Sequence, residues 1–174
     1  RAAGAHYVAG DIGPIGALLR PLGTLSFDEA YDLFAEEVRA GVDAGVDLFI
    51  IETMTDLAEI KAAVLACPEN SDLPVFATMT FEEDGRTFLG TSPEVAAITL
   101  DAIGADVLGI NCSQGPAELR GLAARMLTVT DKPIMVQANA GLPHVDDDGN
   151  TVFDIQAPEY AKAVAGMIAD GVSV

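Results

Sequence analysis

Short apolar segments recur along the chain, and each is followed by a loop and then by a helical pattern. They occupy residues 7–10, 47–51, 75–79, 106–110 and 134–138, and a sixth begins at Gly171. Most of these segments are nearly continuous in apolar residues, which is typical of parallel strands buried on both faces. A strand–helix unit repeated in this way predicts an α/β fold with a parallel sheet.

Helix start signals stand between the apolar segments. Ser26 and Glu29 have the spacing of a capping box, because a serine side chain and a glutamate three residues later can each bind the other's backbone N–H. Other start signals stand at Thr55-Asp56, Ser92-Pro93-Glu94, Gly115-Pro116 and Ala157-Pro158-Glu159. We therefore expect five helices, each placed between two strands.

Polar residues follow the apolar segments, at the point where each strand should end. These residues are Asp11, Glu52-Thr53, Thr78 and Thr80, Asn111-Cys112-Ser113, and Asn139. An open, doubly wound sheet gathers ligand groups at one switch point, whereas all strands of a barrel end at the same mouth. The recurrence favours part of a (β/α)8 TIM barrel, with an open sheet or a complete small α/β domain as alternatives.

Length and composition limit the remaining function classes. The chain has 174 residues, the size of one domain over 1–174, and half of them are hydrophobic, which excludes global disorder. The net charge of −18 makes nucleic acids and membrane surfaces poor partners. No apolar run approaches the roughly 20 residues that a membrane helix needs. We expect a cytoplasmic protein.

Two cysteines have different expected positions. Cys112 follows a strand, where its thiol could be a nucleophile or a metal ligand. A cysteine that is buried and only packs against its neighbours fits the spacing equally well. Cys67 ends a helix, so in a barrel it lies at the opposite face, where residues serve stability. The two thiols should not form a disulfide.

Two carboxylates and one amide also stand at strand ends. Asp11 and Glu52 could act as a general base or bind a substrate ammonium group, or they could cap the helices that follow. Glu52 directly follows an apolar segment and has no Lys or Arg nearby in the sequence, so a ligand cation would suit it. The amide of Asn139 could bind substrate, bind a metal through its oxygen, or hold its own loop.

Taken together, these segments resemble a known family. The matching segments are Gly10-Asp11-Ile12-Gly13-Pro14, Glu52-Thr53, Met79-Thr80-Phe81, the run from Gly109 to Pro116, and Asn139-Ala140-Gly141. In this order they resemble the homocysteine S-methyltransferase domain, most closely the N-terminal homocysteine-binding module of cobalamin-dependent methionine synthases. The resemblance runs over essentially the whole chain.

The resemblance implies a (β/α)8 barrel that binds zinc through three cysteines. Cys112 matches the first, and the other two form an adjacent pair in a Gly-Gly-Cys-Cys-Gly stretch that does not occur in these 174 residues. Residues 1–4 are then the end of a helix, and the chain corresponds to about strands three to eight. We expect these residues alone neither to bind zinc tightly nor to methylate homocysteine. Apolar residues expected to face the open barrel interior, and to favour self-association, are Ile50, Ala77, Leu108 and Val136.

The resemblance also implies roles for the polar strand ends. Asp11 and Glu52 face the amino-acid end of homocysteine, while Thr80, Asn111 and Asn139 line the pocket. The expected product is methionine. The methyl donor that the resemblance favours is methylcobalamin on a separate domain, recharged from methyltetrahydrofolate, with betaine and S-methylmethionine, the donors of related enzymes, as alternatives. The alternatives are a metal-independent barrel enzyme of the lyase or aldolase type, and a non-catalytic binding domain in which Cys112 is only packing.

Overall fold

The computed structural model describes residues 6–112, 114–141, 143–146 and 148–174. The strands are β1 (Ala9–Ile12), β2 (Leu48–Met54), β3 (Val75–Met79), β4 (Val107–Asn111), β5 (Ile134–Gln137), β6 (Pro143–Val145) and β7 (Thr151–Phe153). The helices are α1 (Phe27–Ala44), α2 (Leu57–Asn70), α3 (Pro93–Ala102), α4 (Pro116–Leu127) and α5 (Ala157–Ala169). Strands and helices alternate through β5, as the sequence predicts. The helix end expected at residues 1–4, and Ser113, lie outside the described residues.

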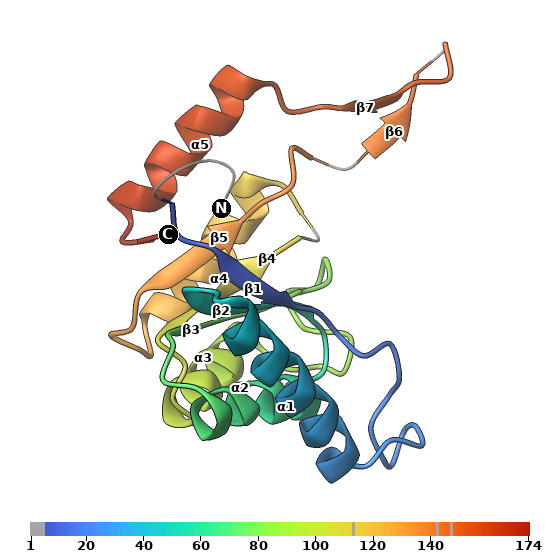
Figure 1. The fold of residues 1–174 in the computed structure, drawn as a ribbon. Helices are drawn as coiled ribbons and strands as arrows, with labels where there is room; N and C mark the ends of the chain where they lie inside the picture. Colours follow the sequence, from blue (N-terminus) through green and yellow to red (C-terminus); the bar gives the residue numbers. More distant parts are fainter. Residues whose placement is uncertain (1–5, 113, 142, 147) are drawn as a thin grey trace.

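The first five strands form one parallel sheet in the order β1-β2-β3-β4-β5 (Figure 1). A doubly wound sheet reverses its strand order at a switch point, and this sheet has no such reversal. The helices also pack on one another in chain order. This arrangement is that of consecutive strands in a TIM barrel, so the predicted partial barrel is confirmed and the open, doubly wound sheet is excluded.

The segment expected as a sixth strand lies alongside β5. The backbone N–H of Ser173 donates to the carbonyl of Ile134 at 2.9 Å, and the N–H of Val136 donates to the carbonyl of Val174 at 3.0 Å. At the other edge of the sheet, β1 begins two residues later than the apolar segment at 7–10 suggests. Tyr7 is 88% exposed, which places it ahead of the sheet.

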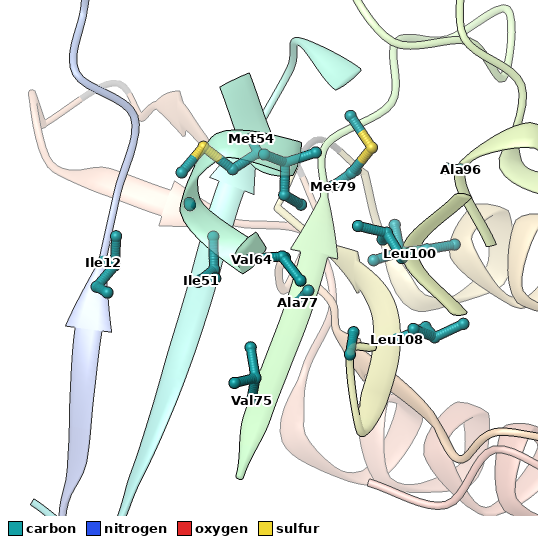
Figure 2. Close-up of a cluster of buried hydrophobic side chains, with 14 of the residues drawn as sticks. Ile12, Ile51, Met54, Val64, Val75, Ala77, Met79, Ala96, Leu100 and Leu108 are labelled. Carbon is teal, nitrogen blue, oxygen red and sulfur yellow. The ribbon is translucent and has the colours of Figure 1, made fainter. Parts of the chain in front are cut away.

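The helices cover one face of the sheet, and the main core lies there. Ile51, Ala77 and Leu108 pair in register across β2, β3 and β4, and all three are fully buried. Figure 2 shows them beside Val64 of α2 and Leu100 of α3. Burying such aliphatic side chains contributes about 1.5–3 kcal/mol each, so this layer fixes the strands whose ends carry the polar residues.

The expected interior-facing set was therefore wrong for three residues of four. Ala77 and Leu108 lie in the helix-covered core, and Val136 pairs in register with the fully buried Ile110 of the same face. Ile50 does lie on the opposite face, which we call the inner face, where it pairs with the half-buried Phe76. The sequence could not separate the two faces, because these strands are apolar on both and show no alternation.

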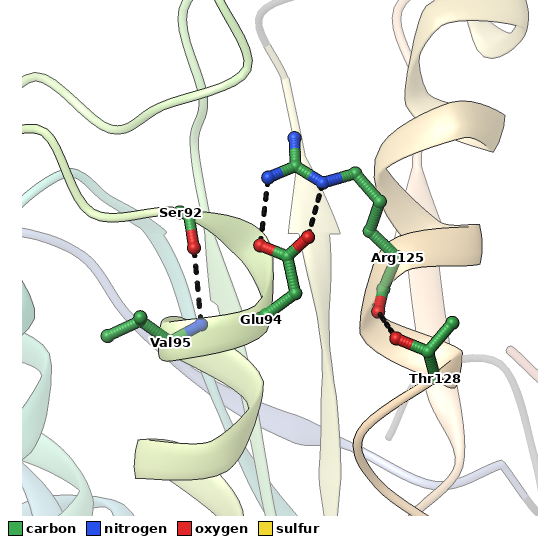
Figure 3. Close-up of polar contacts among 5 residues, drawn as sticks. All are labelled: Ser92, Glu94, Val95, Arg125 and Thr128. Carbon is green, nitrogen blue, oxygen red and sulfur yellow. Dashed lines mark hydrogen bonds and ion pairs between the residues drawn. The ribbon is translucent and has the colours of Figure 1, made fainter.

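The helix start signals work as the sequence predicts. The side chain of Ser26 accepts a hydrogen bond from the backbone N–H of Glu29, whose carboxylate accepts from the N–H of Ser26, so the capping box is complete. Ser92 caps α3 in the same way, accepting from Val95. An ion pair between Glu94 of α3 and Arg125 of α4 joins two neighbouring helices (Figure 3).

An antiparallel hairpin, which the sequence analysis did not anticipate, separates β5 from α5. It consists of β6 and β7, and the carboxylate of Asp146 accepts the backbone N–H groups of Asp148 and Asn150 in the turn between them. His144 Nδ1 lies 3.4 Å from Asp154 Oδ1 near its open end. No helix in the described part of the chain is long and apolar enough to span a membrane.

Candidate functional site

The carboxyl ends of the five parallel strands lie at one edge of the sheet, and polar side chains from three strands meet there. They come from β2, β4 and β5 and the residue after β4, and they are Glu52, Thr53, Asn111, Cys112 and Gln137. Parallel strands make this meeting possible, because residues far apart in the sequence end at the same edge. We call these five residues the strand-end cluster.

The side chain of Asn111 is the centre of the cluster. Its Oδ1 accepts the backbone N–H of Thr53 at 2.9 Å and the hydroxyl of Thr78 at 2.8 Å. Its Nδ2 donates to Thr53 Oγ1 at 2.7 Å and to Cys112 Sγ at 3.3 Å. The residue is only 1% exposed. All four hydrogen-bonding positions of this amide are therefore occupied, and a ligand could contact it only by displacing a protein partner.

Thr53 and Cys112 both have a left-handed backbone conformation. Their φ angles are 61° and 58°, and they are the only non-glycine residues with positive φ in the described ranges. Thr53 lies where the register between β2 and β3 shifts, between Ile51 and Met54, as in a β-bulge. Such a bulge re-aims a side chain. A left-handed conformation costs about 1–3 kcal/mol in a residue other than glycine and is typical of functional sites.

The sulfur of Cys112 has polar neighbours. Cys112 is half-buried, and its Sγ lies 3.3 Å from the donor Asn111 Nδ2 and 3.8 Å from Thr53 Oγ1. Its backbone N–H donates to the carbonyl of Gln137 at 3.0 Å. Cys67 is different: it is fully buried in the last turn of α2, and burial raises the pKa of its thiol to about 12. Both thiols are free, as expected.

Glu52 contacts Gln137 across the inner face. Gln137 Nε2 donates to Glu52 Oε2 at 3.2 Å, and both residues are half-buried. None of the ion pairs among the described residues involves Glu52. Gln137 Oε1 is buried and has no hydrogen-bond partner in the described part of the chain. Among the described residues, this pair therefore includes a buried acceptor oxygen without a donor, beside a carboxylate without an ion-pair partner.

The remaining predicted residues lie around the cluster. Thr80 Oγ1 donates to the backbone carbonyl of Asn111 at 3.2 Å. Asn139 is half-buried and its backbone N–H donates to the carbonyl of Gln114 at 3.1 Å. Asp11 is exposed on β1, and its charge adds to the burial that raises the pKa of Glu37. The structure thus joins Glu52, Thr80, Asn111 and Cys112 through hydrogen bonds, some of them by way of Gln137. The side chains of Asp11 and Asn139 form no hydrogen bond or ion pair with another described residue.

Thr53, Thr78 and Gln137 form hydrogen bonds within the site, and the sequence did not predict these contacts. Thr53 and Thr78 were noted only as polar residues at strand ends, and Gln137 stands inside an apolar segment. A signal was present for Gln137, because a glutamine in a buried strand needs hydrogen-bond partners. For Thr53 there was none, since its role depends on a backbone conformation that the residue type disfavours.

A cavity of about 450 Å³ opens beside the loop that follows Cys112. It is lined by Glu83, Gln114, Gly115, Glu118, Gly141, Asp154 and Ile155. This volume is within the range of small-molecule sites. The described residues contain no group of three His, Cys, Asp or Glu side chains that could hold a metal. Cys112 is therefore not part of a three-ligand group within the described residues.

Comparison with known proteins gives a consistent result. The model of the family described as homocysteine S-methyltransferase matches residues 1–174. The methionine synthases of Mycobacterium leprae (strain TN) and Mycobacterium tuberculosis (strain ATCC 25618 / H37Rv) are each 34% identical over 170 residues, covering 95% of this chain. The chain spans 14% of the length of each of these relatives.

A solved structure supports the fold. The homocysteine methyltransferase MmuM from Escherichia coli, in its metallated form, matches with a TM-score of 0.74 and 23% sequence identity. The match covers 98% of this chain and 55% of the MmuM chain. At this level of identity the likeness establishes a shared architecture, and the chain corresponds to about half of that barrel.

Proposed function

The chain belongs to the homocysteine S-methyltransferase family, and from that premise we propose that it forms part of an enzyme that transfers a methyl group to the thiol of homocysteine, giving methionine. The observation that carries the proposal is the position of Cys112. Cys112 is half-buried, and its sulfur stands at the strand ends beside the Nδ2 donor of Asn111. A cysteine at the mouth of a barrel is where this chemistry needs a metal ligand.

Zinc fits Cys112 as one ligand. A thiolate is a preferred zinc ligand, and the N–H donor beside Sγ suits a negatively charged sulfur. When bound, zinc supplies a Lewis acid that holds a substrate sulfur as thiolate. Cys67 cannot join Cys112, because it is buried in the last turn of α2, and the two further cysteines implied by the resemblance are not among these residues. We therefore propose that these 174 residues alone bind zinc weakly and are inactive.

The reaction is a single displacement. A thiol of ordinary pKa near 8.5 is mostly protonated at neutral pH and must lose its proton before it attacks. A new bond then forms between the homocysteine sulfur and the methyl carbon, while the bond between the methyl carbon and the donor breaks and its electron pair stays with the donor. In this proposal Asn111 and Thr53 hold Cys112 in place, and no covalent bond to the protein forms.

The other predicted residues orient the substrate. Glu52 has no cation among the described residues, so its carboxylate suits the ammonium group of an amino acid. We propose the same end of the substrate for Asp11, whose register partner Ile50 precedes Glu52 by two residues on the inner face. Thr80 and Asn139 border the pocket in this proposal.

The methyl donor is proposed from the relatives. Because the chain is 34% identical to methionine synthases, we propose methylcobalamin recharged from methyltetrahydrofolate, presented by a separate domain. No residue of this chain is assigned to the donor.

Calorimetry on the zinc-loaded full-length protein, of which we propose this chain to be a part, tests the proposed function. L-Homocysteine should bind this protein more tightly than L-homoserine, which carries a hydroxyl in place of the thiol. Cys67→Ser should keep this preference, since Cys67 lies away from the site, whereas Cys112→Ser should lose it. Equal binding of the two amino acids in every variant would refute a thiol-directed site and favour the metal-independent or non-catalytic alternatives.

A further inference from the structure

Gln137 Oε1 is a buried acceptor without a donor. It is the single buried side-chain nitrogen or oxygen without a hydrogen-bond partner in the described ranges. Buried polar groups in native proteins are nearly always paired, and an unpaired acceptor loses its hydration without compensation. Its position at the end of β5, inside the strand-end cluster, points to a donor that arrives with a ligand.

The orientation of the Gln137 amide is fixed by its neighbour. Nε2 donates to Glu52 Oε2 at 3.2 Å. If the amide were turned over, Oε1 would face the carboxylate of Glu52, and two acceptors would oppose one another. The hydrogen bond to Glu52 therefore leaves Oε1 as the atom of the amide that has no partner among the described residues.

The missing donor is best supplied by a cation. Glu52 takes part in none of the ion pairs among the described residues, and it lies beside Gln137. A group with several N–H bonds and a positive charge satisfies both residues at once, because it can donate to the neutral amide oxygen and pair with the carboxylate. A water molecule could fill the amide oxygen alone, but it would leave the charge of Glu52 without a counter-ion.

Gln137 also reaches the sulfur side of the cluster. Its backbone carbonyl accepts the N–H of Cys112 at 3.0 Å. One residue therefore borders both Cys112 and Glu52. A ligand with a sulfur at one end and an ammonium group at the other has a group for each of these two neighbours.

We propose that Gln137 is a specificity-determining residue of this site, whose Oε1 accepts a hydrogen bond from the α-ammonium group of homocysteine next to the carboxylate of Glu52. The proposal rests on the proposed function. It adds a recognition element for the amino end of the substrate, which the residue at the end of β5 provides.

Two ligands and three variants test this role. The ligands are L-homocysteine and 4-mercaptobutanoic acid, which lacks only the amino group, and binding is measured by calorimetry on the same zinc-loaded full-length protein. Gln137→Met keeps the length of the side chain and removes the acceptor. Gln137→Glu keeps an acceptor oxygen. Gln156→Met is the matched control, because Gln156 is an exposed glutamine at the start of α5.

We expect a loss of binding affinity only for homocysteine, the ligand that carries the amino group. Gln137→Met should weaken homocysteine binding about tenfold or more, the range of a hydrogen bond to a charged group, and leave 4-mercaptobutanoic acid unchanged. Gln137→Glu and Gln156→Met should keep the preference for homocysteine. Circular dichroism and thermal melting confirm that each variant is folded before it is titrated.

Failure of this inference and failure of the proposed function would give different results. If Gln137→Met weakens both ligands equally, or neither, Gln137 only packs or binds water, and the inference is wrong while the proposed function stands. If the unaltered protein does not distinguish homocysteine from homoserine in the preceding experiment, the proposed function fails, and the inference that rests on it fails too.

Discussion

Thr53 and Cys112 stand at the ends of β2 and β4 with the same left-handed backbone conformation, and Thr53 Oγ1 lies 3.8 Å from Cys112 Sγ. The two strands are not neighbours in the sheet, since β3 runs between them. The side chain of Asn111 joins them, because its Nδ2 donates to both. The position of the sulfur therefore depends on two strained residues and one buried amide.

Replacing Asn111 should destabilise the fold. Asn111→Ala leaves the backbone N–H of Thr53 and the hydroxyl of Thr78 without an acceptor. Each unpaired buried group costs about 1–3 kcal/mol, so we expect a loss of about 3 kcal/mol in the free energy of unfolding, measured in urea. The exposed Asn150 is the control, for which alanine should cost less than about 1 kcal/mol. Equal losses for both variants would contradict the central role of Asn111.

Strain at Thr53 predicts an unusual order of stabilities. Thr53→Val keeps the shape of the side chain and the strained φ of 61°, but loses the hydroxyl that Asn111 contacts. Thr53→Gly loses the same contact and relieves strain worth about 1–3 kcal/mol. We expect the glycine variant to be at least as stable as the valine variant in urea unfolding. A clearly less stable glycine variant would mean that the left-handed conformation is not strained.

The two cysteines should react at very different rates. Burial raises the pKa of the Cys67 thiol to about 12, whereas Cys112 is half-buried at the strand ends. Because thiolate is the reactive form, one thiol of the two in each chain should react with dithionitrobenzoate in the folded protein at pH 8, and both in denaturant. Peptide mapping after iodoacetamide labelling should find the label on Cys112. Rapid labelling of Cys67 would show that α2 opens readily.

The ion pair between α3 and α4 gives a pH dependence. Hydrogen bonds from Arg125 hold the pKa of Glu94 at about 2, below its ordinary value of 4.5. A lowered folded-state pKa stabilises the protein above pH 4.5, and this contribution is lost as the pH falls toward 2. Glu94→Gln should therefore lower the melting temperature at pH 7, and the difference from the unaltered chain should vanish near pH 2.

A control separates this pair from the general effect of charge. Glu36 is exposed on α1 and forms none of the ion pairs found among the described residues. Glu36→Gln makes the same change in net charge, and its melting temperature should follow that of the unaltered chain at every pH. If both variants behave alike, the Glu94 effect is one of total charge.

Self-association should depend on salt. The inner face carries half-buried apolar side chains such as Phe76, and β1 stands at an edge of the sheet. Both features favour association, while the net charge of −18 opposes it. Light scattering should therefore show larger species as salt rises and screens the charge. A monomer at every salt concentration would contradict this prediction.

Most of the architecture could be predicted from the sequence. The apolar segments gave the strands of the parallel sheet, and start signals such as Ser26 and Ser92 gave the helix starts, because caps and continuous apolar runs are local properties. The hairpin of β6 and β7 was not predicted. Its strands have three residues each, too short for a recognisable alternation.

The candidate site was predicted less completely. Glu52, Asn111 and Cys112 were identified as strand-end residues, but the orphan acceptor of Gln137 and the left-handed conformation of Thr53 were not. Both features depend on contacts between strands that lie far apart in the sequence. The same limit explains the error over Ala77 and Leu108, since only the register shows which face a residue occupies.

The four hydrogen bonds of Asn111 have a consequence for folding. Three of them connect β4 with Thr53 of β2 and Thr78 of β3, so these three can form together only in one alignment of the strands. Strands that are apolar on both faces specify their alignment weakly, because a slip by one residue still buries apolar side chains. A single buried amide penalises every slipped pairing at once. The hydrogen bonds of Asn111 thus favour the native strand register over slipped registers. The same side chain positions the sulfur of Cys112, so the site is assembled when the correct sheet forms.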